Sequence, residues 1–318
     1  MTKLLKLSDL AFVSYPTVPL RWLFAVARLQ GVLRQKTNKR LSRTVRDNLT
    51  SLIPGLSDAE LGTRTRRFFE YSRLGDLLFL LAPRMSDQTL SELCPIYGLD
   101  QLDRYRASGR GAILLASHLN CRAMSLLVVM LRKRGYDLRM AVPNETDPWA
   151  PTAFRTLLNR WIGLRTYFEH MGGFHSQFNI RPIARALADG AIVMQSGDGW
   201  HSAGFAEVDF LNRRLPFTTG MIRVAQLTGV PVVPIFIAGT PPDSLRFVIE
   251  EPFAVGKADA VETKVAAYAK RLEHYLLEQP ECWALLEIPD LLQTWANWPK
   301  RSLQERHRLS STPVERRA

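Results

Sequence analysis

The chain has 318 residues, of which 46% are hydrophobic and 23% are charged, so it can bury one large core and is not of disordered composition. Lysine and arginine outnumber aspartate and glutamate by 42 to 30, which gives a formal charge of +12. This charge favours nucleic acid, an anionic membrane surface or an acidic carrier protein, and the charge alone does not choose among them. We expect no nucleic-acid partner, because the sequence has no helix-turn-helix signal and no motif of interleaved aromatic and basic residues.

The first apolar run, from Leu10 to Leu33, is too interrupted to span a bilayer, which takes about 20 nearly uninterrupted apolar residues. It is broken by Pro16, Pro19, Arg21 and Arg28. The two arginines fall on one narrow stripe of a helix, with apolar residues around the rest. We expect residues 1–35 to form a helix that lies in a membrane interface and is attracted to anionic headgroups. The alternative is a helix packed on the body of the protein.

Residues 36–300 are expected to form the main domain, and residues 301–318 a basic flexible tail. Residues 40–90 predict two helices around Ile53-Pro54-Gly55, with a capping box that begins at Ser57. The hydrophobic period then changes. Short apolar runs predict strands at 111–117, 137–142, 191–195 and 230–238, and residues 258–278 predict an amphipathic helix. The fold class is therefore α/β, a mixed central sheet flanked by helices, with an N-terminal interfacial helical extension.

The predicted strand at 111–117 ends at His118, and an apolar helix follows soon after. An imidazole accepts a proton near neutral pH, which suits His118 to activate a hydroxyl for attack on a thioester. A histidine at a strand end can also be a hydrogen-bonded structural residue. The rest of the chain favours the first interpretation.

Several segments point the same way when they are taken in order: 45–49 (Val-Arg-Asp-Asn-Leu), 98–103, 111–118, 188–198, 208–220 and 229–234. In order and spacing they resemble the bacterial lipid A late acyltransferases, a branch of the lysophospholipid acyltransferase superfamily. The resemblance covers roughly residues 40–285. Each segment alone would be a weak signal, whereas the ordered set is strong.

The resemblance implies a catalytic histidine followed, after four residues, by an acidic residue that orients its ring. Here His118 has Ala123 at that position. The site borrows a carboxylate from elsewhere, or the chain is a branch of low activity, or Ala123 is a deliberate substitution. Asp198 is the leading substitute, because it follows an apolar strand and aligns with an aspartate of a later family segment. Its other role would be to brace the loop at 197–199. Glu145 and Glu169 are weaker acidic candidates.

The resemblance also implies residues that bind substrate. Arg213 stands where the family has an arginine, after Asn212 in place of a glycine, and would bind an anionic group of the donor or acceptor. Asn212 tolerates a left-handed backbone. Arg160 matches the family's arginine-then-glycine spacing and is a candidate for a phosphate contact. Thr218 begins or caps a helix whose amides could receive an anion. Asn120 either braces the turn after His118 or meets the substrate.

A competing hypothesis makes Cys121 a nucleophile that forms an acyl-thioester with the help of His118. It is the weaker one, because a residue at that spacing needs helical geometry to approach the ring. The three cysteines have no zinc or disulfide spacing, and we expect no metal and no cofactor.

The expected function is an acyltransferase on the cytoplasmic face of a bacterial inner membrane. It would move a fatty acyl chain from an acyl carrier protein or coenzyme A (acyl-CoA) thioester to a hydroxyl of a lipid A-type or related glycolipid acceptor. His118 would be the base, in a ternary complex without a covalent enzyme intermediate. The alternative is a membrane-bound lipid-binding or scaffold protein that kept the fold and lost the reaction, as the absence of a carboxylate at Ala123 would allow.

Overall fold

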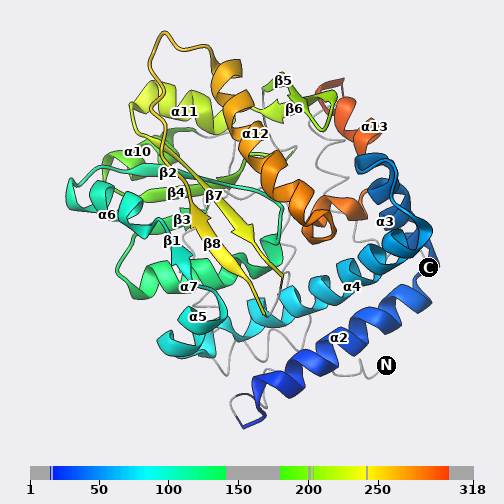
Figure 1. The fold of residues 1–318 in the computed structure, drawn as a ribbon. Coiled ribbons are helices and arrows are strands. Elements are labelled where there is room, and N and C mark those ends of the chain that lie inside the picture. Colours follow the sequence, from blue (N-terminus) through cyan, green and yellow to red (C-terminus); the bar gives the residue numbers. More distant parts are fainter. Residues whose placement is uncertain are drawn as a thin grey trace, which may run out of the picture.

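A computed structural model describes residues 15, 17–140, 180–199, 202, 204–240 and 243–300 (Figure 1). The N-terminal region is helical, with α2 at Leu20–Thr37, α3 at Lys39–Leu52 and α4 at Asp58–Leu81. The predicted capping box is confirmed, because the Ser57 hydroxyl accepts from the Glu60 amide and the Glu60 carboxylate accepts from the Ser57 amide at 2.9 Å. The predicted tail at 301–318 and residues 1–14 lie outside the described residues.

The centre of the domain is a six-stranded mixed sheet with the strand order β1-β8-β7-β2-β4-β3. Its strands are β1 Ile96–Tyr97, β2 Ala112–Ala116, β3 Leu138–Met140, β4 Ile192–Ser196, β7 Val232–Ala238 and β8 Arg246–Ile249. β2 runs parallel to β4 and β7, while β7 and β8 are antiparallel. The predicted fold class is confirmed. The sequence did not predict β1 or β8. β1 has only two residues, too few to show the alternation of a strand, and β8 is a short strand that begins at an arginine.

Helices cover both faces of this sheet, which explains why β2 is an unbroken apolar run. Side chains alternate across a strand, so Ile113 and Leu115 join one core cluster while Ala112, Leu114 and Ala116 join the other. The first face carries α10 Ile180–Ala188, α11 Gly220–Thr228 and α12 Val261–Glu278, and the second carries α5 Asp87–Leu93, α6 Leu99–Ala107 and α7 Met124–Lys133 (Figure 1).

A two-stranded antiparallel hairpin packs beside α12, with β5 at Phe205–Phe210 and β6 at Arg213–Thr218. Its two turn residues, Leu211 and Asn212, have φ angles of 53° and 58°. Left-handed backbone at both positions matches the twist of a two-residue hairpin. The expectation that Asn212 replaces glycine in a left-handed turn is therefore confirmed. α13, Leu291–Ala296, packs against β6.

The helix α2 lies along α4 (Figure 1) and buries Leu23, Phe24 and Ala27 against the body of the protein. Gly31 permits the close approach, because a Cβ there would lie 2.6 Å from the Phe69 carbonyl oxygen. The opposite face remains apolar and exposed, with Trp22, Val26, Leu29 and Leu33. The packed-helix alternative therefore holds for one face of α2, and the other face is free for an interface. Among the described helices, none is both long and apolar enough to cross a bilayer.

The buried side chain of Asn48 connects α3 to the C-terminal segment. Its Nδ2 donates to the Leu286 and Ile288 carbonyls at 2.9 and 2.7 Å, and its Oδ1 accepts from the Leu291 amide at 3.0 Å. We expect Asn48→Leu to lower the free energy of unfolding by about 3 kcal/mol, because buried polar groups lose their partners. Urea unfolding measures the change. Asn38→Ala, at the partly exposed N-cap of the same helix, should cost only about 1 kcal/mol, and equal losses would contradict the assignment.

Candidate functional site

The site lies where β2 and β4 end, because these strands are parallel and in register. Ala116 is paired with Ser196, so the residues two positions later, His118 and Asp198, emerge together at the same edge of the sheet. Asp198 is buried, with 1% of its surface exposed, whereas the His118 side chain is partly exposed. The structure therefore brings the proposed base next to the acidic residue that stood first among the substitutes.

The contact between the two side chains is a hydrogen bond of 2.8 Å between His118 Nδ1 and Asp198 Oδ1. The His118 backbone amide also donates to both carboxylate oxygens, at 3.0 and 2.9 Å. A third group, the indole Nε1 of Trp283, donates to Oδ2 at 2.9 Å. Because an ionised carboxylate only accepts, the proton of the neutral imidazole lies on Nδ1 and its lone pair on Nε2. This is the tautomer that a general base requires.

Two glycines make room for this geometry, one on each side of Asp198. A Cβ at Gly197 would lie 2.5 Å from the Tyr268 ring, and a Cβ at Gly199 would lie 3.3 Å from His118 Cε1. Tyr268 cannot give way easily, since it is fully buried and its hydroxyl donates to the Ala116 carbonyl at 2.5 Å. Asp198 thus combines the two roles expected for it. It braces the loop by accepting from the His118 backbone amide, and it contacts the imidazole.

The turn after His118 is held by Asn120, which has a left-handed backbone with φ 49°. Its side-chain amide donates to the Ile237 and Gly239 carbonyls, each at 3.0 Å. Its own backbone amide donates to the Cys282 carbonyl at 2.9 Å. These contacts connect the turn to β7 and to the C-terminal segment, so Asn120 braces the turn, which is the first of the two expected roles.

Ala123 ends a short 3₁₀ turn at Cys121–Ala123 and has 1% of its surface exposed. The preceding residue, Arg122, forms ion pairs with Asp76 at 2.7 Å and with Glu287 at 2.9 Å, which fix the turn against α4 and the C-terminal segment. A methyl group accepts no hydrogen bond, so position 123 contributes nothing to orienting His118.

The predicted substrate-binding residues are separated in the fold. Thr218 lies near the hydrogen-bonded pair of His118 and Asp198, hereafter the dyad, since its hydroxyl donates to the Gly197 carbonyl at 3.0 Å. The expectation that it begins or caps a helix is wrong: Thr218 is still paired in β6, and α11 has Thr219 at its N-cap. Arg213 is exposed at the turn of the hairpin, five residues from Thr218, or about 16 Å along an extended strand. Arg160, Glu145 and Glu169 lie outside the described residues.

A small pocket, partly open to solvent, lies between α4 and the turn after His118. It is lined on the α4 side by Phe68, Tyr71, Ser72 and Gly75. Burial raises the pKa of the Cys121 thiol, another lining residue, to about 12. A thiol with so high a pKa is a poor nucleophile at neutral pH, which argues against the Cys121 hypothesis. The described ranges contain no cluster of His, Cys, Asp and Glu suited to a metal ion.

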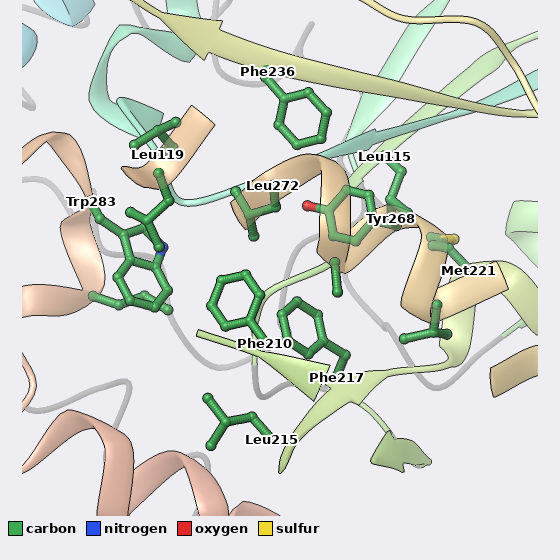
Figure 2. Packing of buried hydrophobic residues seen from close by; sticks show 14 of the residues in the cluster. Leu115, Leu119, Phe210, Leu215, Phe217, Met221, Phe236, Tyr268, Leu272 and Trp283 are labelled. Atoms are coloured by element: carbon green, nitrogen blue, oxygen red, sulfur yellow. The ribbon is translucent and has the colours of Figure 1, made fainter. Parts of the chain in front are cut away.

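Two residues beside Asp198, Trp283 and Tyr268, were not predicted from the sequence. Both belong to the core cluster of Figure 2, in which Trp283 lies next to Leu119 and Tyr268 projects from α12 beside Phe217. Trp283 is 85 positions away from Asp198 in the chain. Large aromatic residues in apolar segments are typical of any core, so only the fold reveals these contacts.

The fit of Gly197 against Tyr268 leads to a stability prediction. Gly197→Ala should lower the free energy of unfolding by about 2 kcal/mol, the scale of an overpacked core site. The added Cβ would overlap the ring of Tyr268, which is buried and hydrogen-bonded. Thermal or urea unfolding measures it. The matched control is Gly62→Ala in α4, where a Cβ meets nothing within 4 Å and should stabilise the helix by up to about 1 kcal/mol. Equal changes in the two variants would refute the overlap.

A comparison with protein families finds that the family model described as bacterial lipid A biosynthesis acyltransferase matches residues 10–288. The match includes both His118 and Asp198 and extends over the resemblance seen in the ordered segments. A comparison with individual curated proteins gave no match.

Proposed function

The chain belongs to the bacterial lipid A biosynthesis acyltransferase family, and on that premise we propose that it transfers a fatty acyl group from a thioester donor to a hydroxyl of a lipid A-type or related glycolipid acceptor. The proposed base is His118. The observation that carries the proposal is the 2.8 Å contact of its Nδ1 with the buried Asp198 carboxylate. This contact places the lone pair of the neutral ring on Nε2, the atom that would take the proton.

In the proposed reaction, His118 Nε2 takes the proton of the acceptor hydroxyl while the hydroxyl oxygen attacks the thioester carbonyl carbon. Asp198 stabilises the imidazolium that forms and keeps its ring in place. The tetrahedral intermediate then breaks its carbon–sulfur bond, and the imidazolium returns its proton to the leaving thiolate. An ester and a free thiol result, and His118 is neutral again.

We further propose that Asp198 takes the role that an acidic residue at position 123 has elsewhere in the family. Its position supports this, because it already occupies the Nδ1 side of the ring. On this proposal, Ala123 does not leave His118 without an orienting carboxylate. The impaired or scaffold alternative lacks this support, and activity assays decide between the two.

The donor is proposed to be an acyl carrier protein or acyl-CoA, and the location the cytoplasmic face of the bacterial inner membrane. Anionic groups of either donor or of the acceptor suit Arg213 and Arg160 as partners. The exposed apolar stripe of α2, formed by Trp22, Val26, Leu29 and Leu33, supports peripheral contact with a bilayer. Exposed basic residues adjoin it at the junction of α2 and α3: Lys36, Lys39, Arg40 and Arg43.

The first test concerns the dyad. We expect His118→Ala and Asp198→Asn to lower kcat by about 10² to 10⁴, the range for removing a general base or its orienting carboxylate. Ala123→Glu should bring no gain, because Nδ1 already has a carboxylate partner. Acyl transfer is measured with radiolabelled acyl donor and a lipid A precursor. Asp209→Asn, an exposed carboxylate on β5, is the matched control and should leave kcat within about twofold.

Three outcomes would contradict this function. Full activity of the His118→Ala variant would show that His118 is not the base. A large gain in activity from Ala123→Glu would show that Asp198 does not orient His118. Inactivity of the unaltered chain with every thioester donor would favour the scaffold alternative.

The second test concerns the membrane. Replacing Trp22 and Leu29 by serine in the full chain should lower binding to phosphatidylglycerol-containing liposomes by at least about tenfold, because apolar area no longer enters the interface. Point variants are needed, since the other face of α2 packs on α4. Leu227→Ser on α11 removes a leucine that is even more exposed than Leu29 and should leave liposome sedimentation unchanged. Equal binding of the α2 variant and the unaltered chain would reject the interfacial role.

A further inference from the structure

We propose that Trp283 is a positioning residue for acyl transfer, whose indole N–H holds the Asp198 carboxylate in the orientation that presents Oδ1 to His118. This inference rests on the proposed function and adds a residue to it that lies 85 positions beyond Asp198. It acts through Asp198, not by touching a substrate, because Trp283 is fully buried.

The two oxygens of Asp198 have different tasks. Oδ1 accepts from His118 Nδ1 at 2.8 Å, while Oδ2 accepts from Trp283 Nε1 at 2.9 Å. The His118 amide lies between them and donates to both, so by itself it does not distinguish one oxygen from the other. The indole N–H fixes Oδ2, and thereby keeps the carboxylate from rotating Oδ1 away from the ring.

The position of the indole is itself tied to the backbone around His118. Leu119 and Trp283 form an antiparallel bridge. The Ala284 amide donates to the His118 carbonyl at 3.1 Å, and the Asn120 amide donates to the Cys282 carbonyl at 2.9 Å. Three consecutive residues of the C-terminal segment thus hold three consecutive residues of the catalytic turn. The base, its carboxylate and the indole are held as one unit.

The aromatic cluster prevents the indole ring from turning. Trp283 lies 6.3 Å from Phe210 and 5.4 Å from Trp295, measured between ring centroids (Figure 2 shows Trp283 with Phe210). Trp295 provides a matched comparison within this cluster. It is also buried, and its indole Nε1 donates to the Pro216 carbonyl at 2.6 Å rather than to the dyad.

The test compares Trp283→Phe with Trp295→Phe in the full-length protein. Each substitution removes one buried indole N–H from the same cluster, so both should lower the melting temperature. Only Trp283→Phe should lower kcat, by about 10- to 100-fold, the scale for residues that orient a histidine through a second hydrogen bond. KM for donor and acceptor should stay within about twofold, since no substrate contact is lost.

A double-substitution cycle separates positioning from general loosening of the fold. In the Asp198→Asn background, Trp283→Phe should cause almost no further loss of kcat, because the group it positions is already gone. Equal kcat values for the two tryptophan variants, or a full additional loss in the Asp198→Asn background, would overturn the proposal. If Trp283→Phe does not fold, Trp283→Tyr and Trp295→Tyr are compared by the same criteria.

These outcomes are distinct from a failure of the proposed function. An active His118→Ala variant would reject the base and with it the role of Trp283. An inactive His118→Ala variant, combined with equal kcat values for the two tryptophan variants, would reject only the positioning role.

Discussion

The buried carboxylate of Asp198 is the group on which the rest of the site depends. A charge removed from water is costly unless hydrogen bonds replace the lost solvation, and here three donor groups do so: the His118 ring, the His118 amide and the Trp283 indole. The same bonds that stabilise the charge therefore set the geometry of the ring. Loss of any one of them disturbs both stability and orientation.

Three distant parts of the chain supply this arrangement. The parallel register of β2 and β4 places two strand ends at one edge of the sheet, and the C-terminal segment closes over them. That segment is anchored in turn to α3 through Asn48 and to α4 through Glu281, a buried carboxylate paired with Arg64 at 2.6 Å. The N-terminal helices thus support the turn after His118, while the outer face of α2 remains exposed and apolar.

The proposed role of Asp198 as the orienting carboxylate rests on its contact with His118 Nδ1. A carboxylate at 123 would come from the turn that follows His118, whereas Asp198 comes from the neighbouring strand. Only one partner can occupy Nδ1 at a time. Position 123 holds a small residue that is buried against α4, where Gly75 lies against Arg122.

The sequence by itself determined the fold class, four central strands, the capping box at Ser57 and the left-handed Asn212, and it named His118 as a candidate base, because each depends on local pattern or chain order. It did not determine which acidic residue reaches His118, nor that Thr218 stays in a strand and Arg213 lies at an exposed turn. Only the tertiary structure decided these points. Strand register places residues 80 positions apart in contact, and the core selects Trp283 from seven tryptophans that look alike in sequence.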